Sequence, residues 1–537
     1  MAEVTESAPP APTTAEGPWK PKFNPWLIAI VVALAAFMEV LDTSIANVAL
    51  PHMAGNLGAS NDESTWVLTS YLVSNAIVLP ISGWLASLFG RKRFFLVCIL
   101  LFTISSLFCG AAPSLAILII CRVIQGVGGG GLQPMAQAIL ADTFPPQQRG
   151  LAFALYGITA IMAPTIGPTL GGWITDNYSW RWIFYINLPI GILTLFLVYR
   201  MVEDPPYLRR VKGAGIRVDY IGIALLAIGV GALQILLDKG QEDDWFGSHF
   251  ITTLALVSAI CLLSLVVWEW RQRDPVIDVR LFKNFNFATA NLMMFTLGII
   301  LFSSLVMMPQ FLQTLMGYTA QSAGLVLSAS GVVLLFEMPV VGQLTTKFPA
   351  KYIIGFGWLS LACAMYYSTV RVDLQISFQA AAWLRVAQAF GMGFLFVPIT
   401  LAGYIGIPAE KSNSVSGLVN FMRNMGSSVG TSMVTTLLAR RAQFHQSVLS
   451  YHTTTFDPAF RNQVSGLSQQ LLHSGSSAAD AQTHAYGLIY QSMQAQSQTL
   501  AYIDTYMVLA VGAGIMFLLA FIIRKNDPHG GGEVAVG

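Results

Sequence analysis

Charged residues are scarce in this sequence. Only 10% of its 537 residues are charged, whereas 54% are hydrophobic. A soluble protein of this length carries roughly a quarter charged residues, so there is too little charge here to cover a water-facing surface. We therefore expect a protein whose surface mostly faces lipid, with no nucleic-acid partner.

The patterns of several membrane-protein classes are also missing. The sequence contains no Gly-Lys pair and hence no G-x-x-x-x-G-K-[ST] phosphate loop, which argues against an ATP-driven pump. None of the seven histidines lies at mid-membrane and no His or Cys cluster exists, so we expect no metal site, no cofactor and no enzyme activity. The predicted loops on the side of the termini are too short for the effector domain of a sensor.

Cysteine is rare and lies only in apolar surroundings. Such residues are expected to be packed thiols without disulfide bonds. The five positions are Cys98, Cys109, Cys121, Cys261 and Cys363.

Long hydrophobic runs dominate what is present. A bilayer core requires about 20 apolar residues per helix. Fourteen runs qualify: 26–50, 65–88, 94–111, 115–140, 149–172, 181–200, 218–237, 249–269, 286–309, 322–345, 352–370, 380–403, 413–438 and 501–523. An even number of spans places both termini on the same side of the membrane.

The distribution of basic residues predicts the orientation. Of the 29 Lys and Arg residues, 20 lie in loops on the side of the termini, so the positive-inside rule makes both ends cytoplasmic. The segment 1–25 has neither a basic n-region nor a cleavage site and reads as a disordered cytoplasmic tail before an uncleaved first helix. Residues 524–537 form a second cytoplasmic tail.

A weak internal duplication divides the chain. "LPISGWLASLFGRKR" (79–93) aligns with "MPVVGQLTTKFPAKY" (338–352), and "CRVIQGVGGG" (121–130) aligns with "LRVAQAFGMG" (384–393), at nearly the same offset. We therefore predict an all-α polytopic membrane protein of two six-helix bundles. The bundles span 26–200 and 285–523, and the linker 201–284 carries two inserted helices. Duplicated halves with a binding site between them are a transporter architecture.

Two acids lie inside the first hydrophobic run. Asp42 follows Leu41, and Glu39 is the only charged residue of Leu27–Leu41. At about 1.5 Å per residue, Asp42 lies roughly 24 Å into the membrane from the side of the termini. Arg122, on a helix that enters from the opposite side, and Glu39 lie at a similar depth. An acid that is desolvated when neutral and held by a cation when ionised can act as a protonation switch.

Other roles for these acids remain open. Asp42 could merely hydrogen-bond a neighbouring helix, and Glu39 could recognise a cationic substrate instead of a proton. Arg385 occupies in the second half the place of Arg122, but no acid near position 301 matches Asp42. This asymmetry favours proton coupling over a packing role shared by both halves.

Polar side chains predict a central cavity. The run 413–438 carries Ser416, Asn420, Arg423, Asn424, Ser427 and Thr431 at helical spacing, so one face must meet protein or water. The candidate substrate-cavity residues are Asn75, Gln133, Gln137, Asn291, Phe295, Gln310, Glu337, Asn420, Arg423 and Asn424. Taken singly, each is more often a packing residue than a ligand contact. An apolar cavity with a few acids and amides suits amphipathic compounds.

Four short stretches combine small residues, helix breakers and cations. They are "LDTSIANVALP" (41–51), "GWLASLFGRKR" (83–93), "RVIQGVGGGG" (122–131) and "APTIGPTLGG" (163–172). As a set they resemble the signature motifs of the major facilitator superfamily. "WRWIFYINLPIG" (180–191), "FLQTLMGYTAQSAGL" (311–325) and the inserted helix pair are similar to its 14-helix drug:proton antiporters.

The resemblance implies a function and a set of gating residues. It implies proton-coupled efflux of amphipathic toxic compounds by alternating access across a bacterial inner membrane, with Asp42, Arg122 and Glu39 in proton coupling. The implied gating residues are Gly83, Gly90, Arg91, Pro164, Gly167, Pro168 and Gly171. Ser87 stands where the superfamily usually has an acid, which puts the charge relay at the cytoplasmic gate in doubt. The alternative is an exporter of one endogenous metabolite, such as a siderophore or an amino acid.

The segment 440–500 does not belong to the lipid. It is rich in Gln, Ser and His, with helix-compatible stretches at 439–450 and 478–500. It could be a solvated loop. The resemblance implies instead a docking surface for a periplasmic adaptor of the membrane-fusion type, which would join the protein to an outer-membrane channel in a tripartite pump.

Overall fold

The computed structural model describes residues 21–205, 218–272, 274–451, 453–454, 456–475 and 477–523. Most of the predicted tails 1–25 and 524–537 and part of the linker 201–284 lie outside these residues. Within the described residues the secondary structure is helical and contains no strand, so the predicted all-α fold is confirmed.

Thirteen helical segments of the described chain are long and apolar enough to cross a membrane, by length and composition. They are α1 (Pro25–Leu57), α2 (Asn61–Phe89), α3 (Arg91–Ala111), α4 (Leu115–Thr143), α5 (Pro146–Asn177), α6 (Trp182–Tyr185) with α7 (Asn187–Met201), α8 (Tyr220–Lys239), α9 (His249–Arg271), α10 (Phe285–Thr314), α11 (Ala320–Lys347), α12 (Ala350–Arg371), α13 (Phe378–Ala402) and α16 (Ala478–Ala520). Short 3₁₀ turns occupy Trp245–Gly247, Val279–Lys283 and Ala409–Lys411. Each of these thirteen segments contains or overlaps one predicted span.

The remaining predicted span, 413–438, lies on α14 (Ser412–Ser450) and is too polar to qualify by hydropathy. Its polar residues are nevertheless enclosed: Ser416, Asn420 and Arg423 are buried. Helix α14 packs against α10, α16, α2 and α4, so its polar face meets protein rather than lipid.

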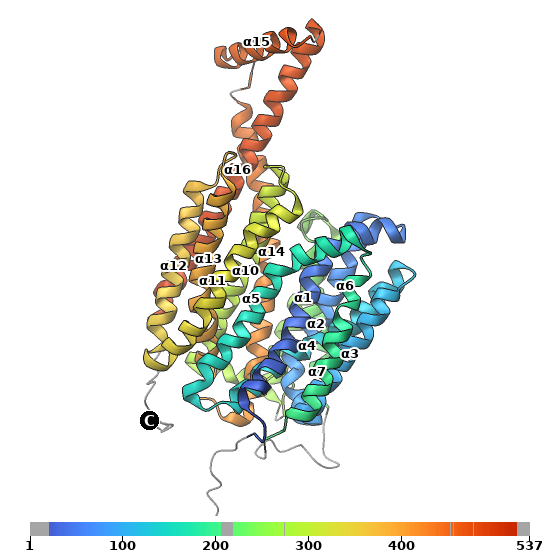
Figure 1. Ribbon diagram of the computed structural model, residues 1–537, viewed down its shortest axis with the longest axis vertical. Helices are drawn as coiled ribbons and strands as arrows, with labels where there is room; N and C mark the ends of the chain where they lie inside the picture. The colour runs from blue at the N-terminus through green and yellow to red at the C-terminus, as the bar shows by residue number, and fades with distance from the viewer. Residues whose placement is uncertain are drawn as a thin grey trace, which may run out of the picture.

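The helices form two packed sets, and the boundary between them is called the seam (Figure 1). Helices α1–α5 and α7 pack on one another, as do α10–α14 and α16. Helix α5 lies against α11 and α2 lies against α14, which joins the sets. The inserted helices α8 and α9 pack together, and α8 also contacts α2 and α14.

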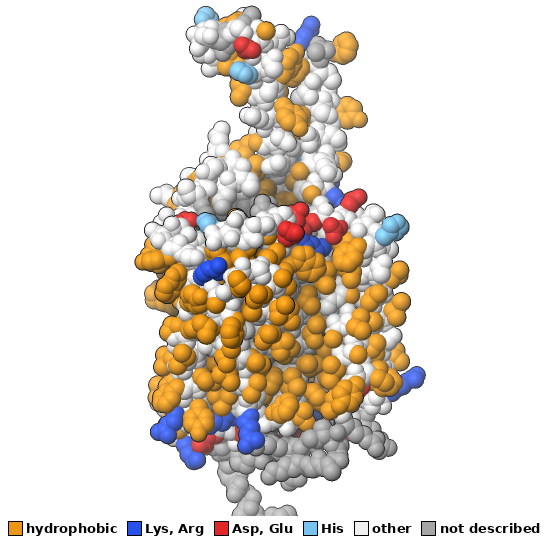
Figure 2. Space-filling model, turned by 90° about the vertical axis from the view of Figure 1, so that its right-hand side faces the viewer, with side chains coloured by type: hydrophobic (Ala, Val, Ile, Leu, Met, Phe, Trp, Pro, Cys, Tyr) orange, Lys and Arg blue, Asp and Glu red, His pale blue; other side chains and the backbone are white. Residues whose placement is uncertain are grey.

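The two ends of the bundle differ. The terminal face is the end where α1 begins and α16 ends, and the stalk face is the opposite end (Figure 1). On the face that Figure 2 shows, an apolar band covers the bundle, with Lys and Arg along its edge at the terminal face. Cys98 and Cys109 are buried as predicted, but Cys363 is exposed, so the prediction of a packed thiol was wrong there.

A helical stalk rises from the stalk face. Helix α14 continues to Ser450 and α16 begins at Ala478, which confirms the two predicted helical stretches of segment 440–500. A further helix, α15 (Pro458–His473), folds back on α16 at the tip (Figure 1). Phe460 and Val464 of α15 pack there against Ala485 and Ile489 of α16 in a small core of their own. The stalk, residues 440–500, is therefore not merely a solvated loop.

Glycines set the spacing of α10 and α14. An added Cβ at Gly430 would lie 2.6 Å from the carbonyl oxygen of Ile299, and one at Gly426 would meet the carbonyl oxygen of Phe295. Such contacts require the backbones of the two helices to move apart.

Gly430→Ala is therefore expected to lower the free energy of unfolding by about 1–3 kcal/mol, because it overpacks a helix contact. Gly512→Ala is the matched control. An added Cβ at Gly512 meets nothing within 4 Å, and replacing a glycine by alanine favours the helix, so this variant should not lose stability. Thermal melts of the detergent-solubilised variants measure the difference. Equal melting temperatures would show that α10 and α14 do not pack through Gly430.

Candidate functional site

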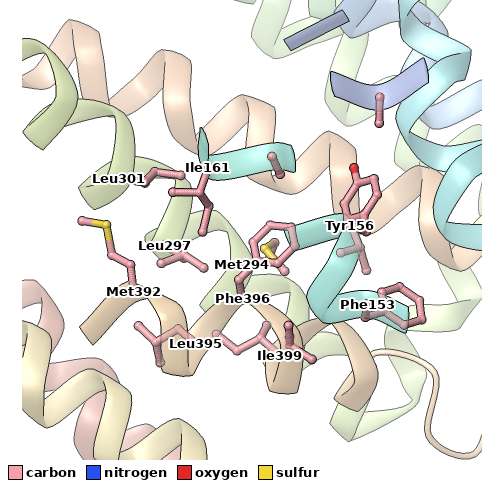
Figure 3. Packing of buried hydrophobic residues seen from close by; sticks show 14 of the residues in the cluster. Phe153, Tyr156, Ile161, Met294, Leu297, Leu301, Met392, Leu395, Phe396 and Ile399 are labelled. Carbon is pink, nitrogen blue, oxygen red and sulfur yellow. The ribbon is translucent and has the colours of Figure 1, made fainter. Parts of the chain in front are cut away.

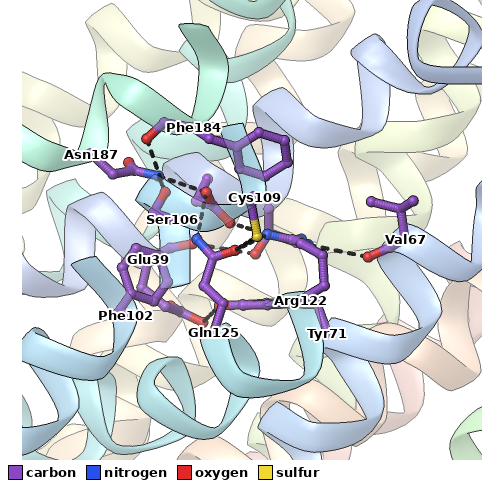
Figure 4. A network of polar contacts seen from close by, with 12 residues as sticks. Glu39, Val67, Tyr71, Phe102, Ser106, Cys109, Arg122, Gln125, Phe184 and Asn187 are labelled. Carbon is purple, nitrogen blue, oxygen red and sulfur yellow. Dashed lines mark hydrogen bonds and ion pairs between the residues drawn. The ribbon is translucent and has the colours of Figure 1, made fainter. Parts of the chain in front are cut away.

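Asp42 of α1 and Arg122 of α4 form a buried ion pair. Arg122 Nη1 lies 2.6 Å from Asp42 Oδ2, and the two residues are 0% and 2% exposed, respectively. The other carboxylate oxygen accepts hydrogen bonds from Gln125 Nε2 at 3.1 Å and from Asn187 Nδ2 at 2.6 Å. The structure thus pairs Arg122 with Asp42, one of the two acids that lie at a similar depth in the sequence. Figure 4 shows Arg122, Gln125 and Asn187 in this network.

Arg122 is held by more than its acid. Its Nε donates to the carbonyl oxygen of Val67 at 3.1 Å, and its guanidinium lies 4.2 Å from the centre of the Tyr71 ring. Its Nη2 has no hydrogen-bond partner among the described residues. The arginine would keep these other contacts if the carboxylate became neutral.

The second half contains the corresponding arginine without an acid. Arg385 Nη1 donates to Ser304 Oγ at 2.8 Å and to Gln388 Oε1 at 3.2 Å. In the first half, Arg122 Nη1 donates to Gln125 in the same way, at 2.8 Å. Ser304 therefore stands opposite Arg385 where Asp42 stands opposite Arg122.

Glu39 belongs to a different network from Asp42, although only three residues separate them on α1. Its Oε1 accepts from Tyr71 Oη at 3.1 Å and from Asn75 Nδ2 at 3.0 Å, and its Oε2 accepts from Gln133 Nε2. Glu39 is 3% exposed. Tyr71 links the two networks, since its hydroxyl binds Glu39 and its ring covers Arg122.

The Glu39 network crosses the seam between the two sets of helices. Arg423 of α14 donates from Nη2 to Gln133 Oε1, which also accepts from Tyr156 Oη at 3.1 Å. A second cross-seam bond runs from Asn420 Nδ2 to Gln137 Oε1 at 2.8 Å.

Asn424 Nδ2 adds a longer contact, 3.4 Å from Asn75 Oδ1. The structure therefore gathers six predicted cavity residues around Glu39: Asn75, Gln133, Gln137, Asn420, Arg423 and Asn424.

Four predicted cavity residues lie elsewhere in the described structure. Asn291 donates within α10 to the carbonyl oxygen of Phe287, and Phe295 of the same helix touches Gly426 through its backbone. Gln310 is exposed near the stalk-face end of α10. The Glu337 carboxylate lies against Gly393 of α13, with no hydrogen-bond partner among the described residues.

An apolar cluster adjoins the network on the C-terminal side. Tyr156 stacks on Phe396 with ring centres 6.0 Å apart and an interplanar angle of 22°. Met294, Leu297 and Met392 lie in the same cluster, which α5, α10 and α13 supply (Figure 3). Polar and apolar groups thus meet at one point of the seam.

A second buried ion pair closes the seam at the terminal face. Arg91 is 2% exposed, and its Nη2 lies 2.6 Å from Asp142 Oδ2 of α4. The same guanidinium reaches across to α14, with 2.7 Å from Nε to Asn413 Oδ1 and 3.0 Å from Nη2 to Ser412 Oγ. The preceding Gly90 has φ of 87°, a conformation that glycine tolerates and other residues rarely adopt.

Ser87 does not supply this cluster. Its hydroxyl donates to the carbonyl oxygen of Trp84 in its own helix, at 2.7 Å. Arg91 obtains its carboxylate from Asp142 instead, so a charged cluster exists at the terminal face despite the missing acid. Gly83 lies one turn before Ser87 on α2. An added Cβ at Gly83 would lie 2.8 Å from Ser414 Cα, which places α2 and α14 in close contact.

The Pro- and Gly-rich stretch of α5 packs against α1 beside the Asp42 pair. The hydroxyl of Ser44 donates to the carbonyl oxygen of Pro164 at 3.2 Å. An added Cβ at Gly167 would meet the Ser44 side chain, and one at Gly171 would lie 3.0 Å from Ile45. Pro168 lies one turn beyond Pro164 in the same helix.

Sequence reasoning missed several members of these networks. Asn187 lies within the quoted stretch 180–191 and Gln125 within 122–131, so the motifs contained them without indicating their partner. Asp142 is an acid at the end of a hydrophobic run and could have been noticed as a partner for the cations 91–93. Tyr71 and Tyr156 are single aromatic residues in apolar helices and give no sequence signal.

Proteins of known family are similar to this chain in sequence and in fold. The multidrug export protein EmrB of Haemophilus influenzae is 37% identical over 94% of this chain and 96% of its own length. EmrB of Escherichia coli K12 is 36% identical over the same shares. The solved structure of the proton:xylose symporter XylE has a TM-score of 0.60 at 14% identity, covering 94% of this chain and 97% of that one, and shares the fold.

The family model of the Major Facilitator Superfamily matches residues 32–431. The resemblance inferred from the motifs is thereby confirmed. This multi-pass membrane protein belongs to the major facilitator superfamily.

Proposed function

We propose that this protein is a proton-coupled multidrug efflux transporter, a drug:proton antiporter of the bacterial inner membrane. It exports amphipathic or lipophilic toxic compounds by alternating access, with the terminal face and both termini in the cytoplasm. The observation that carries the proposal is the buried Asp42–Arg122 pair, a titratable acid with a fixed cation inside the helix bundle. Two relatives named as multidrug export proteins support the substrate class.

Protonation of Asp42 is the proposed coupling step. A proton on the carboxylate removes the charge that Arg122 faces, so the ion pair weakens and the guanidinium relies on Val67 and Tyr71. Tyr71 also binds Glu39, and Glu39 reaches Arg423 of the other half through Gln133. The proton state of the first half is thereby linked to contacts across the seam.

Transport in inverted membrane vesicles tests the proposal as a whole. Several structurally unrelated lipophilic cations should accumulate when a proton gradient is present, and an uncoupler should stop their accumulation. Transport of a single metabolite and of none of these compounds would instead support the metabolite exporter. Transport that an uncoupler leaves unchanged would overturn proton coupling.

Asp42→Asn is expected to abolish proton-driven transport while preserving substrate binding and membrane expression, because the amide keeps the shape and polarity but cannot titrate. Ser304→Ala is the matched control, since it alters the equivalent contact of Arg385 without removing an acid. Drug uptake into inverted vesicles under an imposed pH gradient measures both. Full transport by Asp42→Asn would rule out Asp42 as the coupling acid.

The terminal-face cluster is proposed as the cytoplasmic gate. Arg91→Ala removes the cation from a buried pair, which typically costs about 3–5 kcal/mol, so the adjoining ends of α2, α4 and α14 should open more often. Hydrogen exchange of these helix ends, followed by mass spectrometry, is expected to increase. Arg93 is an exposed cation of the same helix turn, and Arg93→Ala should leave the hydrogen exchange of these helix ends unchanged. An equal response of both variants would contradict the proposal that the Arg91–Asp142 cluster is the gate.

The stalk is proposed as the docking surface of an EmrA-like periplasmic adaptor, which would connect to a TolC-like outer-membrane channel. It projects beyond the bundle at the stalk face, opposite the end where α1 begins and α16 ends (Figure 1). Large apolar side chains are exposed on it, including Phe456, Tyr451 and Tyr490. Exposed aromatic residues in a polar surrounding are typical of protein–protein interfaces.

Replacing residues 451–485 with a short Gly/Ser linker is expected to separate transport from resistance. Transport in liposomes should persist, because Asp42 and the seam lie in the bundle, whereas resistance of whole cells and co-purification of the adaptor should collapse. Phe456→Ser keeps the hairpin folded and should weaken adaptor binding on its own, because Phe456 lies outside the small α15–α16 core. Unchanged resistance and unchanged adaptor binding would show that the stalk is only a connection.

A further inference from the structure

A positively charged side chain occupies the point where the polar network and the apolar cluster meet. Arg423 is 5% exposed, yet it makes no ion pair with any carboxylate among the described residues. Its guanidinium instead contacts Gln133 Oε1 and lies 5.7 Å from the centre of the Phe396 ring. Glu39 attracts the guanidinium electrostatically from beyond Gln133, and Tyr156 interacts with it as well, but no carboxylate pairs with it directly. Neutral groups alone are weak partners for a full charge in a buried position.

The surroundings of Arg423 have the chemistry of a cation site. Gln133 stands between Arg423 and Glu39: its amide oxygen contacts Arg423, and its amide nitrogen donates to the Glu39 carboxylate. Glu39 likewise has no ion pair among the described residues. Asp42 and Asp142 are already paired, with Arg122 and Arg91. Glu337 also lacks a hydrogen-bond partner among the described residues, but its carboxylate lies against Gly393 of α13 and makes no contact with Gln133. The charge of Glu39, the amide of Gln133 and the ring of Phe396 are therefore available to whichever cation occupies this point, and in the structure it is Arg423.

The adjoining cluster is closely packed in this structure and has the chemistry that the apolar part of a substrate needs once the seam opens. Phe396 stacks on Tyr156 and belongs to the same cluster as Met294 and Leu297 (Figure 3). Methionine is unbranched and adapts to ligands of different shape. A molecule with a cationic group and a bulky apolar body would place each part next to matching groups.

We propose that Arg423 is an internal substitute for the cationic group of the substrate, and that amphipathic organic cations bind by displacing its guanidinium from Gln133 and Phe396. This inference rests on the proposed efflux function and defines its substrate class. A displaced Arg423 no longer bonds α14 to α4, so occupation of the site also removes a contact across the seam. Substrate binding and separation of the two halves are thereby coupled.

Equilibrium binding to the purified full-length protein in lipid nanodiscs, at fixed pH and without a gradient, tests the inference. The probe is tetraphenylphosphonium, and tetraphenylborate serves as an anion of the same shape. If Arg423 blocks the site in about nine of ten molecules, its removal tightens the apparent affinity about tenfold. Arg423→Gln is thus expected to bind tetraphenylphosphonium more tightly than the wild type, and Arg423→Lys, which keeps the charge, to bind it much as the wild type does.

Glu39→Gln tests the other half of the site. It should weaken tetraphenylphosphonium binding, and in the double variant with Arg423→Gln the gain in affinity should disappear. If Arg423→Gln does not purify as a monodisperse protein, Arg423→Met carries the same expectation. Unchanged or weaker tetraphenylphosphonium binding by the neutral variants would overturn the inference, as would a selective loss of tetraphenylborate binding, which would make Arg423 an anion receptor.

The outcome is separable from that of the proposed function. Binding at equilibrium requires neither a proton gradient nor an adaptor. The expected binding pattern without proton-driven transport would overturn the proposed function alone, whereas proton-driven drug transport with the opposite pattern would overturn the role of Arg423 alone.

Discussion

Charge inside an apolar helix bundle must be neutralised or hydrogen-bonded, and the arrangement of this protein follows from that constraint. Asp42 is matched by Arg122 and Asp142 by Arg91, each at 2.6 Å. Neither pair joins neighbours in sequence. Each requires a particular contact between helices, α1 with α4 in one case and α3 with α4 in the other. Helix α4 thus contributes one member to each pair, near opposite ends of the bundle.

The glycine run of α4 makes the second network possible. An added Cβ at Gly129 would lie 2.5 Å from Tyr71 Oη and 3.1 Å from Asn75 Nδ2, so these side chains occupy space that only glycine leaves free. From there both reach the Glu39 carboxylate. Close helix packing through small residues therefore serves the polar network directly, because it brings α2 near enough to α1 for the hydrogen bonds to form.

Two acids three residues apart acquire different surroundings. Asp42 is enclosed by α1, α4 and α7 within one half, whereas Glu39 faces the seam and reaches α14 through Gln133. The first position suits a group whose charge is set by a fixed partner. The second suits a group that responds to what lies between the halves. Tyr71 contacts both networks, through its hydroxyl to Glu39 and its ring to Arg122.

Hydropathy alone determined the helical fold and thirteen of the spans, because lipid requires about 20 apolar residues and leaves a backbone few alternatives to a helix. Helical depth also placed Arg122 level with both Asp42 and Glu39, since these positions follow from counting residues, but it did not choose between the two acids. Tertiary structure decided the rest. The separation of Glu39 from Asp42, the pairing of Arg91 with Asp142 in place of Ser87, and the position of Glu337 against Gly393 depend on which helix faces which. Sequence spacing specifies a helix face but not the neighbour it meets.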